Sequence, residues 1–181
     1  MSDVTPKDIL DFWINAGSKR WYAKSDEFDA EIVSNFRSCH EIARAGGLDG
    51  WCETPEGALA LIILLDQFPR NMYRCTPDMF AADAKALAIA KEALARGFDA
   101  EVPEPLRQFF FMPFMHSEQL EEQERCVSLF TEAGLKDSIS YAVDHRDIVA
   151  KFGRFPHRNK VLERETSAEE QAFLDDGGFA G

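Results

Sequence analysis

Three segments of this sequence place arginine, histidine, aspartate or asparagine among large apolar side chains and beside a proline. They are Leu65–Asn71, Phe111–Glu118 and Phe152–Asn159, and together they hold two of the four histidines. Arginine, histidine and asparagine side chains can donate hydrogen bonds to an anion, and aspartate or histidine can take up a proton. Burial of such groups without a partner is costly, so we expect them half-buried at helix ends and gathered into one shared polar site.

Asp66 directly follows a wholly apolar stretch, Ala58–Leu65, and Arg70 lies one helical turn further on. We expect the carboxylate to enter the core and to need a partner, which Arg70 could supply although Pro69 bends or ends the helix between them. A buried ion pair that fixes the helix end and a ligand-binding role remain equally open.

His116 of the second segment, His145 before the third segment and the loop within the third segment are further candidates. His116 precedes Ser117 at an expected helix start, where an anion would gain free backbone N–H groups, although a purely local cap explains it as well. His145 shares an expected helix face with Ile148 and Phe152, which is typical of a hydrogen-bonded core histidine. In the loop after Gly153, two arginines and a histidine project donors that would suit an anion clamp or would pin the loop to carbonyl groups.

These residues give the candidate sites. The expected ligand-binding residues are Arg70, Asn71, His116, His145, Arg154, His157 and Arg158. The candidate catalytic groups are Asp66 and His145. We expect no metal and no cofactor, because the sequence has no zinc-type spacing of histidine and cysteine and no glycine-rich phosphate loop.

Residues that typically start or end helices recur along the chain and predict one helix after another. Expected helix starts are Thr5-Pro6, Ser25, Thr54-Pro55, Thr76-Pro77, Ser117, Asp137 or Ser138, and Ser167, and expected ends include Gly17, Gly46, Gly97, Gly134 and Gly153. Thr5 with Asp8 and Ser167 with Glu170 have the spacing of a capping box. No segment alternates apolar and polar residues as a half-buried strand does. We therefore predict an all-α fold, although no clean internal repeat is visible.

The 181 residues fit a single domain, 1–181, with a frayed tail at 175–181. The net charge of −12 argues against nucleic acid and anionic membrane surfaces as partners. No apolar run is long enough to span a bilayer and no basic, apolar leader is visible, so we expect a cytoplasmic protein. The four cysteines lack a C-x-x-C pair and are expected to be reduced. The fifteen phenylalanines leave a homodimer patch open.

The same three segments, together with Ile9–Trp13 and Arg20–Lys24, closely resemble a bacterial family known as domain of unknown function 924. The resemblance extends over nearly the whole chain. It implies a tetratricopeptide-like array of about seven to eight antiparallel helices, with no established activity. The sequence differs from the family pattern at Cys75 and Glu163, where glycine is usual, and at Ala168, where proline is usual.

Three functions stay open at this point. The first is a helical binding module whose arginine- and histidine-lined pocket takes an acidic peptide or a small anion. The second is a hydrolase that uses Asp66 or His145 as a general base, with arginines that stabilise developing negative charge. The third is a structural or interaction protein in which the polar segments only join helix ends.

Overall fold

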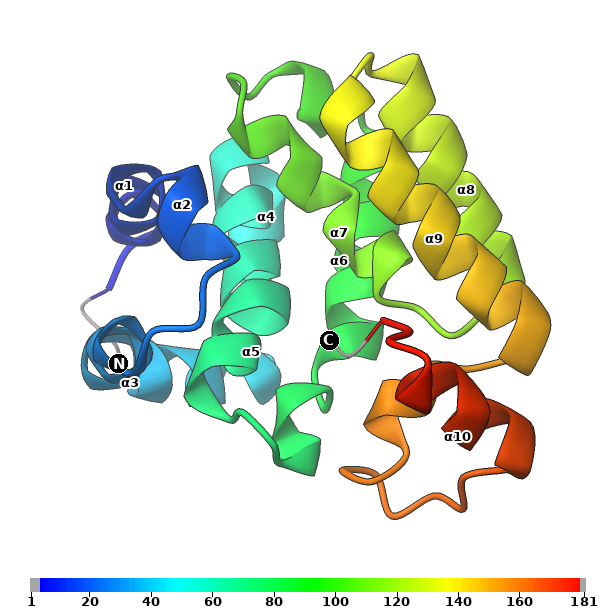
Figure 1. The fold of residues 1–181 in the computed structure, drawn as a ribbon. Helices are drawn as coiled ribbons and strands as arrows, with labels where there is room; N and C mark the ends of the chain where they lie inside the picture. Colours follow the sequence, from blue (N-terminus) through cyan, green and yellow to red (C-terminus); the bar gives the residue numbers. More distant parts are fainter. Residues whose placement is uncertain (1–3, 180–181) are drawn as a thin grey trace. The chain divides into compact units, whose positions relative to one another are not determined.

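The computed structural model describes residues 4–179 (Figure 1), and every regular element within that range is helical. The predicted all-α class is thereby confirmed. The chain divides into two compact units, unit 1 with Met1–Arg74 and Asp78–Pro113, and unit 2 with Cys75–Pro77 and Phe114–Gly181. The single domain and the tetratricopeptide-like array remain predictions.

Unit 1 begins with helices that start where the sequence predicts. Thr5 caps α1 (Pro6–Ala16) in a capping box with Asp8, and Gly17 ends that helix with a φ of 71°. After the short α2 (Ser18–Trp21), the Ser25 hydroxyl accepts from the backbone N–H of Phe28 and caps α3 (Asp26–Arg44). Side-chain oxygens thus satisfy N–H groups that have no partner inside the helices, which is why these two starts could be read from the sequence.

The centre of unit 1 is the apolar stretch that the sequence places in the core. It forms α4 (Pro55–Ile62) and one π-helical turn (Ile63–Gln67), and every residue from Ala58 to Asp66 is at most 1% exposed. The helical chain does not end at Pro69, which was one of the two outcomes expected there. Pro69 instead lies in the first turn of α5 (Phe68–Met72), directly after the π-helical turn, where a missing N–H costs little.

The rest of unit 1 contains α6 and several 3₁₀ segments, of which the sequence predicted only part. Thr76-Pro77 does not start a long helix: a 3₁₀ turn (Pro77–Met79) comes first, and α6 runs from Asp83 to Ala95. The other 3₁₀ segments are Asp49–Glu53, Phe98–Ala100 and Leu106–Phe110, and the short α7 (Met112–Met115) begins at the end of unit 1.

Unit 2 is built on α8 (Leu120–Glu132) and α9 (Lys136–Phe152), which lie side by side in Figure 1 and are joined by a short turn. Two predicted starts were wrong. Gln119, not Ser117, precedes α8, and Leu135, not Asp137 or Ser138, precedes α9, and neither start has a side-chain cap. Gly153 ends α9 with a φ of 70°, as predicted.

The last part of unit 2 is a 3₁₀ turn (Pro156–Arg158) and α10 (Ala168–Asp175), whose start is the predicted capping box of Ser167 and Glu170. Of the tail that we expected to fray, residues 180 and 181 lie outside the described residues. Within the described part, the ring of Phe179 contacts His145 and His157.

Two backbone positions have left-handed angles without being glycine. They are Cys75, with a φ of 60°, and Glu163, with a φ of 53°. These are the positions at which the resembled family usually has glycine. Because a Cβ atom makes this conformation unfavourable, both residues are strained for a local backbone reason.

No helix among residues 4–179 is long and apolar enough to cross a membrane. Cys39 and Cys126 are buried and Cys75 is exposed, and none of the four cysteines forms a disulfide bond within residues 4–179.

Candidate functional site

Asp66 lies within the π-helical turn of unit 1 and is fully buried. Its carboxylate accepts a hydrogen bond of 2.6 Å from the Gln67 amide, and one of its oxygens lies 3.4 Å from a guanidinium nitrogen of Arg70. A carboxylate with no exposure and two donors beside it cannot meet a substrate without rearrangement.

The Arg70 guanidinium lies closer to the carboxylate of Asp83 on α6 than to the carboxylate of Asp66. Its two terminal nitrogens donate to the two Asp83 oxygens at 3.0 Å each, a bidentate arrangement, and it also donates to the backbone carbonyl of Asp66. Burial lowers the pKa of Arg70, but the charges of Asp66 and Asp83 outweigh burial, so the pKa is raised overall. Arg70 is therefore committed to joining two helices of unit 1.

Asn71 also has an internal partner. Its amide donates to Asp29 of α3 at 2.8 Å, and Arg74 adds a hydrogen bond of 3.1 Å and an ion pair to the same carboxylate. Asp29 was not among the predicted site residues, because its position in the acidic first turn of α3 has a sufficient explanation in the helix dipole.

Arg154 of unit 2 is held in the same way. It donates to both carboxylate oxygens of Glu170 at 2.6 and 2.8 Å and to the carbonyl of Glu165 at 2.8 Å. The hydrogen bond from Arg154, together with the Ser167 N–H, lowers the pKa of Glu170 to about 2 even though desolvation opposes that change. This pair anchors the start of α10 to the turn after α9.

A second ion pair, between Arg164 and Glu118, holds the loop between α9 and α10. Arg164 donates to the two oxygens of Glu118 at 2.7 and 2.9 Å, and the N–H of Phe155 donates to Glu118 at 2.8 Å. Burial acts to raise the pKa of Glu118, but these hydrogen bonds outweigh it and the pKa is lowered. The sequence does not indicate this pairing, since 46 positions of chain separate the two residues.

Four predicted site residues of unit 2 influence one another electrostatically. They are His116, His145, His157 and Arg158, which we call the donor cluster. Arg158 is 7% exposed, donates to the backbone carbonyl of His116 at 2.9 Å, and has its guanidinium 4.6 Å from the centre of the Phe155 ring. The chain thus brings a buried positive charge beside the imidazole rings.

His145 is oriented by its own helix. Its Nδ1 lies 2.7 Å from the carbonyl oxygen of Tyr141, so in the neutral ring Nδ1–H donates to that carbonyl and Nε2 carries the lone pair. Burial, followed by the charges of His116 and Arg158, lowers the pKa of His145 to about 4. The ring is therefore neutral at pH 7.

His157 is the least satisfied member of the donor cluster. Its ring lies 5.5 Å from Phe155 and 5.1 Å from Phe179, centre to centre, and its Nδ1 is buried without a hydrogen-bond partner. Burial, followed by the charges of Arg158 and His145, lowers its pKa to about 3. A buried polar atom left without a partner costs ~1–3 kcal/mol, so this nitrogen calls for an explanation.

Sequence reasoning missed one buried histidine. His40 of α3 is 1% exposed, its Nδ1 lies 3.4 Å from the Tyr73 hydroxyl, and its Nε2 is buried without a partner. The signal was available, because His40 continues the apolar face of Phe36 and Ala43 at helical spacing.

The predicted single site therefore divides between the units. Asp66, Arg70 and Asn71 belong to unit 1, where each has an acidic or amide partner, and Arg154 of unit 2 is paired with Glu170. Unit 2 brings together His116, His145, His157 and Arg158. No group of three or more histidine, cysteine, aspartate or glutamate residues within residues 4–179 is arranged to hold a metal ion.

With this geometry established, comparison with known proteins gives the family. A family model described as a bacterial protein of unknown function, DUF924, matches residues 9–178. The chain belongs to the DUF924 family. The resemblance noted in the three polar segments is thus confirmed over nearly the whole chain.

A solved structure has the same fold as this DUF924 chain. It is that of a protein of unknown function from Agrobacterium tumefaciens, which is 47% identical, with 95% of this chain and 97% of that chain covered and a TM-score of 0.91. No curated protein matches the chain. The descriptions of the family and of the similar structure name no reaction.

Proposed function

We propose that this DUF924 protein is a binding module whose donor cluster takes a small anion or the carboxylate terminus of an acidic peptide. The observation that carries the proposal is the buried Nδ1 of His157, which has no hydrogen-bond partner and lies beside the Arg158 charge. An anionic oxygen would satisfy this nitrogen once it is protonated, and the guanidinium would stabilise the negative charge.

The low pKa values of His145 and His157 set how such binding depends on pH. At pH 7 both rings are neutral, and an anion bound beside them would favour the protonated form and raise both pKa values. By linkage, binding takes up protons and becomes stronger as the pH falls through the raised pKa values of the bound state toward the values of about 4 and about 3 in the free protein. We expect weak binding at pH 7.5 and tighter binding at pH 5.

Isothermal calorimetry with sodium sulfate and with a short peptide ending in glutamates tests the proposal. Sulfate does not titrate in this pH range, so proton uptake would report on the protein. His157→Phe keeps the ring packing and removes both ring nitrogens, and we expect it to weaken binding about tenfold or more. Lys160→Gln, which removes an exposed charge two residues from Arg158, is the control for general charge effects. Equal weakening by both variants would reject a built site.

A second function, hydrolysis with His145 as general base, has one specific observation in its favour. The Tyr141 carbonyl fixes the ring so that Nε2 presents its lone pair, the orientation that a general base needs. Asp66 does not contribute, because it is fully buried beside Gln67 and Arg70. Turnover of carboxylate or phosphate esters that disappears in His145→Gln would favour this function over simple binding.

A further inference from the structure

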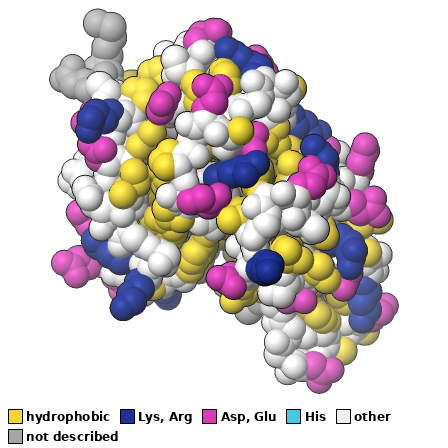
Figure 2. Space-filling model, turned by 90° about the horizontal axis from the view of Figure 1, so that it is seen from above, with side chains coloured by type: hydrophobic (Ala, Val, Ile, Leu, Met, Phe, Trp, Pro, Cys, Tyr) yellow, Lys and Arg dark blue, Asp and Glu magenta, His cyan; other side chains and the backbone are white. Residues whose placement is uncertain are grey.

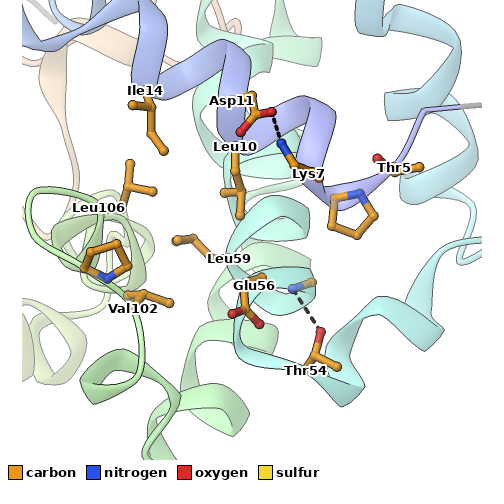
Figure 3. A pocket seen from close by; sticks show the side chains of 13 residues that line it. Thr5, Lys7, Leu10, Asp11, Ile14, Thr54, Glu56, Leu59, Val102 and Leu106 are labelled. Carbon is orange, nitrogen blue, oxygen red and sulfur yellow. Dashed lines mark hydrogen bonds and ion pairs between the residues drawn. The ribbon is translucent and has the colours of Figure 1, made fainter.

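Unit 1 contains a hollow of about 430 Å³ that is independent of the donor cluster. Its walls come from α1, from the start of α4 and from the segment that leads into the 3₁₀ turn Leu106–Phe110. Figure 3 shows Leu10, Leu59, Val102 and Leu106 around the hollow, with Ile14 at its edge. We call this hollow the α1–α4 groove.

The floor of the α1–α4 groove is preformed and apolar. Leu59 is 0% exposed, and Leu106, Val102 and Leu10 are 9% exposed or less, so packing in the core of unit 1 fixes their positions. Ile14, by contrast, is 47% exposed. Large aliphatic side chains on a fixed concave surface are the usual anchor sites for the apolar face of a bound helix.

Most polar groups in the groove already have partners. Lys7 is paired with Asp11, Thr5 caps α1, and the Thr54 hydroxyl accepts from the N–H of Gly57 to cap α4. Glu56 is different: its exposed carboxylate lies beside Leu59 in Figure 3 and makes no ion pair within residues 4–179. One acceptor of full charge therefore remains available next to the apolar floor.

The surroundings of the groove are acidic. The three wall segments, 5–14, 53–59 and 101–106, carry Lys7 together with the carboxylates of Asp8, Asp11, Glu53, Glu56, Glu101 and Glu104. Arg96 lies outside these segments and is 3.8 Å from Glu53. Figure 2 shows one face of the molecule, on which apolar side chains are exposed between basic and acidic ones. The groove thus combines an apolar floor with wall segments that carry six acidic residues and one basic residue.

We propose that the α1–α4 groove docks a partner protein through a basic amphipathic helix, whose apolar face covers Leu10 and Ile14 and whose lysine or arginine side chains meet Glu56. Charge complementarity selects this occupant. A second copy of this chain would bring the same acidic wall segments and a net charge of −12, and an anionic membrane surface would be repelled in the same way.

Fluorescence anisotropy with a labelled leucine–lysine peptide of about 14 residues, designed as an amphipathic helix, tests the proposal on the full chain. We expect saturable binding that Ile14→Gln weakens about tenfold through loss of one apolar anchor. Glu56→Gln should weaken it about threefold and reduce its salt dependence. Ile14 and Glu56 are both exposed, so neither substitution threatens the fold.

Three controls make the result decisive. Glu92→Gln removes an exposed carboxylate from α6 outside the groove and should leave binding unchanged. A peptide of the same composition with its leucines scattered around the helix, and a leucine–glutamate peptide, should both fail to bind. The proposal is overturned if Ile14→Gln binds as the native chain does, if the scattered peptide binds equally well, or if no saturable binding occurs. A concentration-dependent dimer that Ile14→Gln dissociates would assign the groove to a second copy instead.

Discussion

The ring of Phe179 lies 4.5 Å, centre to centre, from the imidazole ring of His145. The same phenylalanine lies 5.1 Å from His157, so one side chain near the end of the described chain contacts two members of the donor cluster. Phe179 is itself 39% exposed. Its ring contributes to the burial that lowers the pKa values of both histidines.

Phe179→Ala should therefore raise the pKa values of His145 and His157 toward the ordinary histidine value, because both rings gain solvent. Histidine carbon and proton resonances followed from pH 7.5 to pH 3 would measure the change. Tyr141→Ala removes a ring that is 62% exposed and serves as the control. Unchanged pKa values in Phe179→Ala would show that the phenylalanine does not cover the donor cluster in solution.

The orphaned nitrogen of His157 predicts a conflict between stability and binding. His157→Phe removes a buried polar atom that has no partner and should raise the free energy of unfolding by about 1 kcal/mol while it weakens anion binding. Urea unfolding measures the first effect and calorimetry the second. A loss of stability would instead indicate that Nδ1 has a hydrogen bond in solution.

Arg70 is expected to act on stability rather than on ligand binding. Asp83→Asn leaves the Arg70 guanidinium with Asp66 as its only acidic partner, at a position where burial opposes the positive charge. We expect this variant to lower the free energy of unfolding by roughly 2 kcal/mol. Anion affinity should not change. Asp78→Asn, which breaks the exposed pair with Arg44, should cost less than about 1 kcal/mol, and an equal cost in the two variants would contradict this assignment.

The two left-handed residues predict stabilising substitutions. Glu163 has a φ of 53°, and this left-handed conformation costs a residue with a Cβ atom about 1–2 kcal/mol. Glu163→Gly removes this strain, but glycine also gives the unfolded chain more conformational freedom, which offsets part of the stabilisation. We expect a net stabilisation of ~0.5–1 kcal/mol for Glu163→Gly and for Cys75→Gly. Gly153→Ala is the control in the opposite direction. It places a Cβ atom at a φ of 70°, where that atom would meet no other atom within 4 Å, so any change in stability reflects the backbone conformation alone.

His40 predicts the pH dependence of stability. Burial, followed by the charge of Arg44, lowers its pKa to about 4, so the unfolded chain takes up a proton near pH 6.5 while the folded chain resists until about pH 4. The contribution is fully present above pH 6.5 and is lost as the pH falls toward 4. Linkage gives a loss of about 2 kcal/mol for His40 between pH 7.5 and pH 5. Urea unfolding at the two pH values should show that His40→Gln loses less stability than the native chain, by about this amount.

The sequence predicted helices well where local chemistry decides them. Thr5, Ser25, Thr54 and Ser167 cap helices as expected, because a side-chain oxygen satisfies a backbone N–H three residues on. Prediction failed where no local cap exists. Gln119 and Leu135 precede α8 and α9 without a side-chain hydrogen bond, so tertiary packing fixes these starts.

The sequence indicated the candidate site residues but not their partners in the fold. The sequence alone suggests that each arginine is available to a ligand. In the fold, however, Arg70 donates hydrogen bonds to Asp83, and Arg154 donates to Glu170, which lies 16 positions further along the chain. Such pairings depend on the fold and leave no mark in local spacing. The donor cluster was found because His145, His157 and Arg158 lie within one short stretch of the chain, around the end of α9.

Sulfate titration followed through the histidine resonances decides whether an anion binds to the donor cluster. We expect that sulfate, at constant ionic strength against chloride, raises the pKa values of His145 and His157 and leaves that of His40 unchanged. Saturation of both shifts at the same sulfate concentration would establish one site. Identical titration curves for His145 and His157 in sulfate and in chloride would show that the donor cluster binds no anion.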